Sequence, residues 1–204
     1  SYIRKLDLNN ALATTEFETD EAKYRREYFV SRDADVAVIH LDADKSKMIS
    51  VDIELERQER VEYRTEDKAI VMFGQLKDGS NGDEGMKYLS KLTVDNEGGN
   101  VDFTNNKIIV RDADKLTLIF SSSTNYKNEN YLAFVDSLMN DAKSHSYKYL
   151  KRKHIESYQE LFNRVELDLG EGITDNHSID DRLYAFQEED DPQLAALYFH
   201  YGRY

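Results

Sequence analysis

A change in the period of the hydrophobic pattern is the feature that most constrains the fold of this chain. Over about residues 2–122, apolar and polar residues alternate with a period of two, which is typical of half-buried β-strands. The clearest stretch sets Ile49, Val51, Ile53 and Leu55 on one face and polar residues on the other. After about residue 126 the period becomes that of an α-helix. The pattern therefore predicts a β region followed by a helical region.

The β region contains several short strands separated by turn signals. Residues 36–41 are largely apolar on both faces, which predicts an interior strand. The turn signals are Asn9-Asn10, DGSNGDEG (78–85), NEGG (96–99) and Asn105-Asn106. Some ten strands at this spacing favour an antiparallel sandwich or barrel over a βαβ sheet. We expect a mainly β antiparallel β-sandwich over residues 1–125.

The helical region, about residues 126–204, is predicted to be a linker. Its longest apolar stripe consists of Tyr147, Leu150, His154, Tyr158, Leu161, Phe162 and Val165. A basic group, formed by Lys148, Lys151, Arg152 and Lys153, is interpreted as the solvated face of that helix. A short helix is expected at IDDRLYAF (179–186).

The last helix is expected to begin at Asp191-Pro192, an N-cap acceptor followed by proline at the first helical position. Its apolar stripe consists of Leu194, Leu197, Tyr198 and Tyr201, and Ala195 and Phe199 widen it. A helix with so wide an apolar surface needs covering. The chain also starts with neither an initiator Met nor a leader segment. We therefore expect truncation at both ends.

Composition excludes several classes of partner. With 27 Lys and Arg against 40 Asp and Glu, the net charge of −13 disfavours nucleic acids and anionic membranes, whereas neutral sugars remain compatible with it. No apolar run approaches the ~18 residues of a membrane span. Cysteine is absent, so disulfides, thiolate nucleophiles and Cys-based zinc sites are excluded.

For each motif that could carry catalysis or bind a metal, a structural role explains the sequence better. Asp-Ala-Asp occurs at 33–35, 42–44 and 112–114, each time beside a strand, which favours turns over a pair of catalytic carboxylates. DGSNGDEG lacks the ligand spacing of an EF-hand, because Ser80 and Gly82 stand at its third and fifth positions. His40 and His154 lie on apolar faces, which favours packing over metal binding. The 14 tyrosines are interpreted mainly as packing residues, and without tryptophan a dedicated lectin is disfavoured. We predict no catalytic, cofactor-binding or metal-binding residue and no cofactor.

Several segments in order nevertheless resemble a known family. They are YIRKLDLNNALATTEF, YRREYFVS, DVAVIHLDADK, GMKYLSKLTV, KLTLIFSSSTNY, HIESYQELFNRVELDLG, DDRLYAF and DPQLAALYFHYGRY. Together they resemble the N-terminal domain of glycoside hydrolase family 95, known chiefly for inverting α-L-fucosidases, with some α-L-galactosidases. The resemblance spans nearly the whole chain, and only DGSNGDEG and the polar stretch 56–68 depart from it.

The resemblance implies a plan of β-supersandwich, helical linker, (α/α)6 barrel and C-terminal β domain. This chain would begin part-way through the supersandwich and end at the first barrel helix. The family's general-acid glutamate and its water-activating asparagines and aspartate belong to the barrel, so no catalytic residue is transferred to this chain. The implied partners are the missing barrel of the same polypeptide and the oligosaccharide substrate of the parent enzyme. The implied location is the bacterial periplasm or exterior.

Two alternatives remain open. A stand-alone carbohydrate-binding β-sandwich module is one, although the long apolar helix at the end argues against it. The other is an accessory domain of a different (α/α)6-barrel enzyme, of the maltose-phosphorylase-like or glucoamylase-like type.

Overall fold

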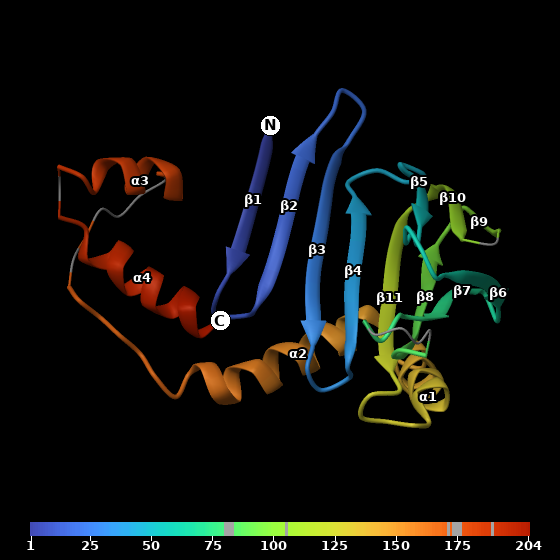
Figure 1. Ribbon diagram of the computed structural model, residues 1–204. Coiled ribbons are helices and arrows are strands. Elements are labelled where there is room, and N and C mark those ends of the chain that lie inside the picture. The colour runs from blue at the N-terminus through green and yellow to red at the C-terminus, as the bar shows by residue number, and fades with distance from the viewer. Residues whose placement is uncertain (80–83, 105, 171, 173–176, 189) are drawn as a thin grey trace.

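In the computed structural model, strands come first along the chain and helices last (Figure 1). The structure describes residues 1–204 except 80–83, 105, 171, 173–176 and 189. Its strands are β1 (Tyr2–Asp7), β2 (Leu12–Glu18), β3 (Lys23–Ser31), β4 (Val36–Ala43), β5 (Ile49–Glu54), β6 (Glu62–Glu66), β7 (Ala69–Gln75), β8 (Lys87–Glu97), β9 (Asn100–Phe103), β10 (Lys107–Ala113) and β11 (Lys115–Thr124). Its helices are α1 (Tyr131–Lys143), α2 (Tyr147–Phe162), α3 (Ile179–Ala185) and α4 (Pro192–Arg203). The predicted mainly β fold class is confirmed.

The strands form two antiparallel sheets of unequal size. The large sheet has the order β1-β2-β3-β4-β11-β8-β7-β6, and the small sheet has the order β5-β10-β9. Within the large sheet, β4 pairs with β3 and with β11. The prediction of an interior strand at residues 36–41 is therefore confirmed.

The first core lies between the two sheets. Ile108 and Val110 of the small sheet are fully buried against Ile70 and Leu116 of the large one. On β5, Ile49, Val51 and Ile53 face this core while the polar residues between them are exposed, as their alternation predicts.

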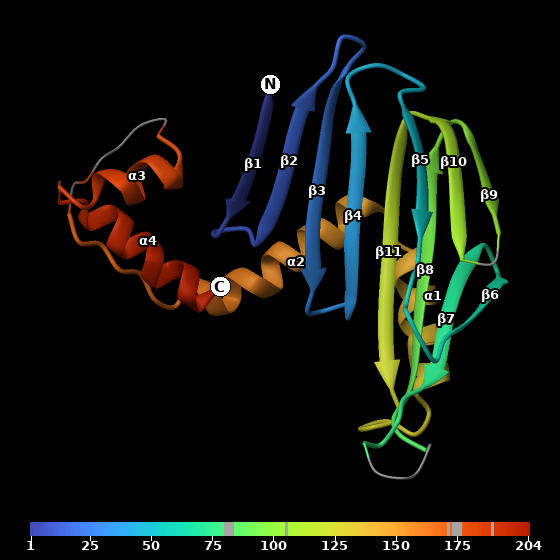
Figure 2. The same cartoon turned by 45° about the horizontal axis from the view of Figure 1, so that its top comes forward.

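The second core lies on the opposite face of the large sheet, beneath α1 and α2. Val135 and Met139 of α1 and Leu150 of α2 pack with Phe29 and Val38 of the sheet. Small sheet, large sheet and helices therefore form three layers where they overlap (Figure 2).

Two strands and one helix end differ from the predicted pattern. Sequence reasoning missed β6, which lies within the polar stretch 56–68, and β9. Helix α2 begins at its N-cap Ser146 and ends at Phe162, with Asn163 as its C-cap. Leu161 and Val165, predicted for the apolar stripe, are exposed because Phe162 takes the buried position and Val165 lies beyond the helix.

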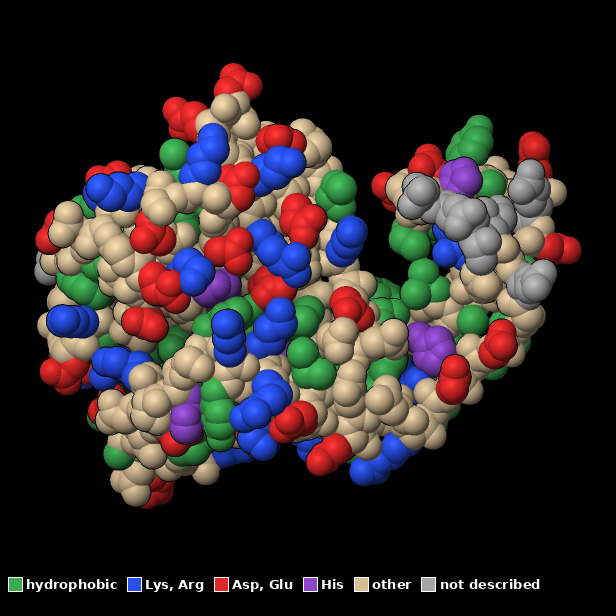
Figure 3. Space-filling view, turned by 180° about the vertical axis from the view of Figure 1, so that it is seen from behind, with side chains coloured by type: hydrophobic (Ala, Val, Ile, Leu, Met, Phe, Trp, Pro, Cys, Tyr) green, Lys and Arg blue, Asp and Glu red, His purple; other side chains and the backbone are tan. Residues whose placement is uncertain are grey.

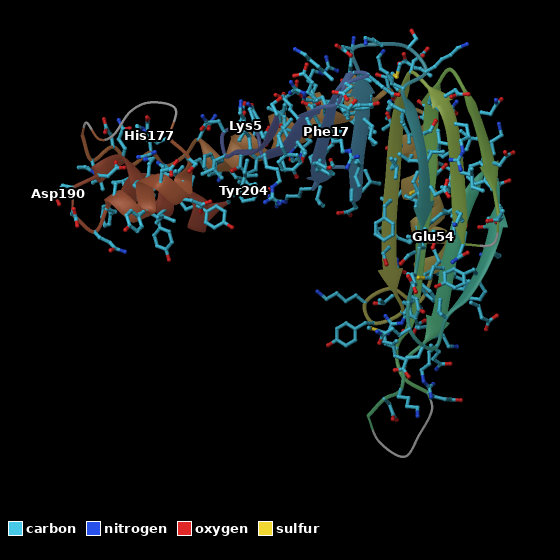
Figure 4. All side chains as sticks on the ribbon, turned by 90° about the horizontal axis from the view of Figure 1, so that it is seen from above. Lys5, Phe17, Glu54, His177, Asp190 and Tyr204 are labelled. Carbon is cyan, nitrogen blue, oxygen red and sulfur yellow. The ribbon has the colours of Figure 1, made fainter. Side chains whose placement is uncertain are left out.

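Helices α3 and α4 form an arm that projects beyond β1 (Figures 1 and 4). Asp191 caps α4 by accepting a hydrogen bond from the backbone N–H of Leu194, so the predicted start of the last helix is confirmed. Arg203 ties the other end of α4 to the segment after α2, since its Nη1 donates to the Val165 carbonyl at 2.7 Å. Among the described residues no helix combines the length and apolarity needed to cross a bilayer.

Candidate functional site

The Asp-Ala-Asp triplets lie at turns and strand ends, as predicted. Asp35 stands in the β3–β4 turn with a φ of 49°. An Asp44 carboxylate oxygen accepts from the backbone N–H of Lys23 at 2.9 Å, and one of Asp114 accepts from that of Lys47 at 2.7 Å. These two carboxylates stabilise turns by accepting hydrogen bonds from the backbone. Within the described ranges, no group of three or more His, Asp or Glu side chains could hold a metal ion.

The segment DGSNGDEG lies partly outside the described residues, because 80–83 are among the omitted positions. Its interpretation as a hairpin loop rather than a calcium loop therefore stays a prediction.

His40 and His154 are buried packing residues, as predicted. The His40 Nδ1 lies 2.9 Å from the Thr117 hydroxyl, and the His154 Nε2 lies 3.0 Å from the Ala11 carbonyl oxygen. The ring of His154 stacks on that of Phe29. Burial lowers the pKa of both imidazoles. Each histidine has the partners of a core residue, which confirms the sequence interpretation.

Glu27 of β3 is a buried acid bound by several side chains, at the place where helix α2 crosses the sheet. Its side chain is held from both elements, and the residue is only 5% exposed. Lys151 of α2 donates to both carboxylate oxygens at 2.8 and 2.7 Å, and Arg25 of β3 donates to one of them at 2.7 Å. The Tyr147 hydroxyl also donates to Glu27, while its ring stacks on His40 with centroids 3.8 Å apart. Three side chains, with four hydrogen bonds, thus converge on one buried carboxylate.

This network corrects one sequence interpretation. Lys151 was expected to lie with the other cations on the solvated face of the helix, whereas it reaches beneath the helix to Glu27. A buried carboxylate needs a cationic partner, and Lys151 supplies one from a helix 124 positions away in the chain. Sequence reasoning also missed Glu27, although one signal existed. Glu27 shares its strand face with Phe29, so the alternation sets an acid on an apolar face.

The charges of this network favour anchoring over proton transfer. Burial alone would raise the pKa of Glu27, but hydrogen bonds from Lys151, Tyr147 and Arg25 outweigh it and lower the pKa to about 2. Burial and the bond to Glu27 raise the pKa of the Tyr147 phenol. Glu27 therefore stays ionised and Tyr147 stays protonated at neutral pH, so neither group is suited to exchange a proton.

The second half of the α2 contact is made with the β1–β2 turn. The Tyr158 hydroxyl donates to the Leu8 carbonyl at 2.8 Å, and the Gln159 amide donates to the Asn9 carbonyl and to the Asn10 side chain, each at 3.1 Å. We name the contact of α2 with β3 and the β1–β2 turn the joint. It fixes both the position and the direction of α2, because polar anchors lie along the length of the helix.

The arm presents an apolar surface. On α4, Leu194 and Ala196 are buried, whereas Tyr198 and Tyr201 are 79% and 57% exposed, and Phe199 is exposed as well. The molecule is hollowed between the arm and the rest of the chain (Figure 3). The outer part of the predicted apolar stripe is thus uncovered.

The tyrosines fall into two groups. Tyr147 and Tyr158 pack in the joint, whereas Tyr126, Tyr184 and Tyr198 are each 79% exposed. The second group does not pack in a core, because these three lie on a loop and on the arm, and the interpretation of the tyrosines as mainly packing residues does not extend to them.

Comparison with known proteins links the two regions to glycosidases. Residues 1–129 match the model described as "Glycosyl hydrolase family 65, N-terminal domain", and residues 146–204 match the "Glycosyl hydrolase family 95 catalytic domain". The second match begins at Ser146, the N-cap of α2. The joint therefore connects the segments that the two models match.

Curated relatives that match the chain are named as alpha-fucosidases. "Alpha-L-fucosidase 2" of Arabidopsis thaliana is 28% identical and "Probable alpha-fucosidase A" of Aspergillus niger is 29% identical, and in both cases all of this chain and 28% of the relative are covered. The chain thus spans less than a third of the length of these curated relatives.

A solved structure shares the fold. The "Putative kojibiose phosphorylase from human microbiome" matches 79% of this chain and 25% of its own with a TM-score of 0.56 at 12% identity. The chain belongs to the family described as "Glycosyl hydrolase family 65, N-terminal domain", whose model matches more than half of it, and residues 146–204 are similar to the family 95 catalytic domain.

Proposed function

We propose that this chain is a non-catalytic part of a larger enzyme that hydrolyses terminal α-L-fucosyl, or related α-L-galactosyl, linkages in oligosaccharides with inversion. The observation that carries the proposal is the coverage of the whole chain by relatives named alpha-fucosidases, in each of which it spans 28–31% of the length. Residues 1–125 act as the β domain and residues 126–204 as the helical connection to the catalytic barrel. We infer a periplasmic or extracellular location from the family alone.

The mechanical role that we propose follows from the joint. Helix α2 is anchored on the large sheet through Glu27 and on the β1–β2 turn through Tyr158 and Gln159. Whatever follows α2 is therefore oriented by the sheet. The exposed aromatic side chains of α4 supply apolar surface that further helices of the barrel would cover, at roughly 25 cal/mol per Å² of apolar area buried.

The chemistry itself requires two groups outside this chain. Inverting hydrolysis needs a general acid and a water-activating base about 6.5–9.5 Å apart across the glycosidic bond. The oxygens of the buried carboxylate Glu27 are occupied by hydrogen bonds from Lys151, Tyr147 and Arg25. A carboxylate so engaged does not serve as that acid or base.

The test is the stereochemistry of the parent enzyme. Incubated with an aryl α-L-fucoside and followed by proton NMR, the full-length protein should release β-L-fucose first, because single displacement inverts the anomeric centre. Release of α-L-fucose first would contradict inversion. Turnover of an α-glucoside only when phosphate is added would instead support the phosphorylase-like alternative.

A further inference from the structure

The C-terminal end of helix α4 is fastened to the end of α2 by an arginine (Figures 1 and 2). Arg203 donates to the carbonyl oxygens of Phe162 and Val165, the latter at 2.7 Å. Phe162 is the last residue of α2, so its carbonyl has no donor within the helix. The guanidinium also lies over the Phe162 ring, 4.6 Å from its centroid. Arg203 therefore caps α2 from α4 and holds the two helix ends together.

A histidine one turn earlier on α4 completes this contact. The Nδ1 of His200 lies 3.0 Å from the Nη1 of Arg203, and its Nε2 lies 3.3 Å from the carbonyl oxygen and 3.2 Å from the backbone nitrogen of Leu167. An arginine side chain has N–H donors and no acceptor, so Nδ1 must accept from it. The single proton of the neutral ring then lies on Nε2, which donates to the Leu167 carbonyl. We name Arg203 and His200, with Phe162, Val165 and Leu167, the clasp.

A second proton on His200 is incompatible with the clasp. This proton would occupy Nδ1, remove an acceptor from Arg203 and set an imidazolium 3.0 Å from a guanidinium. The C-terminal ends of helices favour a cation, but Arg203 already supplies that charge to both α2 and α4. Histidine ordinarily gains its second proton between about pH 5 and about pH 8. The clasp is thus complete only with a neutral ring.

Aromatic rings and a cation surround His200. The half-buried imidazole lies against Phe162 and Phe199, with ring centroids 5.9 and 5.4 Å away. Within the part of the chain that the structure describes, His200 forms no ion pair with an acid. The charged and titratable groups around it are Arg203 and Tyr204 on α4, Tyr158 on α2, and Glu166 and Asp168 on either side of Leu167. The Asp168 carboxylate accepts from the backbone N–H of Gly170.

We propose that the clasp is a pH-sensitive latch, in which protonation of His200 weakens the hold of α4 on α2. The latched state binds one proton fewer than the released state, so the contact is stable at high pH and is weakened as the pH falls. Residues 146–204 are similar to a catalytic domain, so the latch acts on how that segment is seated relative to the β domain. The inference goes beyond the proposed function and does not depend on the identity of the substrate.

Hydrogen exchange of α4 in the 204-residue chain tests the latch. The comparison protein is His200→Asn, whose side-chain oxygen accepts from Arg203 near the Nδ1 position and gains no proton in this range. The wild-type exchange rate divided by the variant's rate at equal pH is free of the chemical pH dependence of exchange. Read at the amides of Tyr198, Phe199 and Gly202, this ratio should rise about 10-fold between about pH 8 and about pH 5.5, because a hydrogen bond to a charged group is lost.

His145→Asn is the matched control. His145 is also half-buried and stacked on an aromatic ring, but it faces the carboxylate of Asp141 rather than an arginine. A chain carrying this change should keep the wild-type rise. In an Arg203→Gln background, proteins with His200 and with His200→Asn should differ by the same factor at both pH values, because the cation that faces the ring is gone.

The protonation of the wild-type ring is a second measurement. Nitrogen-15 spectra of histidine-labelled protein should show His200 with Nδ1 unprotonated and Nε2 protonated at about pH 8. The proposal is overturned by a neutral ring protonated on Nδ1, since such a ring cannot accept from Arg203. It is also overturned by an unchanged exchange ratio, by a rise that persists in the Arg203→Gln background, or by loss of the rise in His145→Asn. Each of these outcomes leaves the stereochemical test of the proposed function unaffected.

Discussion

Replacing Glu27 with alanine is expected to lower the free energy of unfolding of the chain by about 3 kcal/mol, measured by urea denaturation. The substitution leaves Lys151 and Tyr147 beneath helix α2 without the carboxylate to which both donate hydrogen bonds. Loss of one partner of a buried ion pair costs about 3–5 kcal/mol. The lower end applies because Lys151 and Arg25 are partly exposed and regain water.

Glu16→Ala is the matched control. Glu16 also binds Arg25, at 3.0 Å, but its side chain is 41% exposed, so less than about 1 kcal/mol of unfolding free energy should be lost.

The dependence of stability on pH is a second measurement of the same role. The pKa of Glu27 falls from 4.5 to about 2 on folding, so its stabilisation is present above pH 4.5 and disappears as the pH falls toward 2. Glu27→Ala should lack this part of the acid transition. Equal stability of the Glu27 and Glu16 variants would refute the anchoring role.

Replacing Asp191 with alanine is expected to loosen the arm by about 3 kcal/mol, seen as hydrogen exchange of α3 and α4 accelerated roughly 100-fold. Asp191 is fully buried and accepts two hydrogen bonds from Arg182, at 2.8 and 2.9 Å, while capping α4. Its removal leaves Arg182, whose side chain is only 14% exposed, without its carboxylate partner, and it leaves α4 without its N-cap.

Asp190→Ala is the matched control, because Asp190 is one position earlier and exposed. This variant should change the free energy of opening of α3 and α4, derived from hydrogen exchange, by less than about 0.5 kcal/mol. Hydrogen exchange of the large sheet should not change in either variant, because the arm is connected to that sheet through the end of α2. An Asp191→Ala arm that exchanges at the wild-type rate would show that the Arg182 pair does not hold α3 against α4.

The fold could be predicted wherever one face of an element is buried. Strand β5 alternates cleanly because its inner face meets the sheet–sheet core, and β4 is apolar on both faces because a core lies on each side of it. Strands β6 and β9 stand at sheet edges, where charged and polar residues are tolerated and even favoured, so they carry no such pattern.

The joint could be predicted only in part. The packing of His154 follows from its place on the apolar stripe of α2, which is local information. The pairing of Glu27 with Lys151 does not, because partners 124 positions apart meet only once the sheet and the helices are assembled. The family could be predicted from resemblance alone and not from any motif, because no catalytic pattern stands out in the sequence. The residues that build the two cores and the joint hold a fold together, and such residues carry no chemical signature.

The central claim is that the residues that cleave the glycosidic bond lie outside this chain. Turnover of an aryl α-L-fucoside by the purified 204-residue protein tests it most directly. We predict release of the aryl group no faster than in buffer, at protein concentrations where the full-length parent is readily measured. Release above that background, abolished by a single substitution within these residues, would contradict the account.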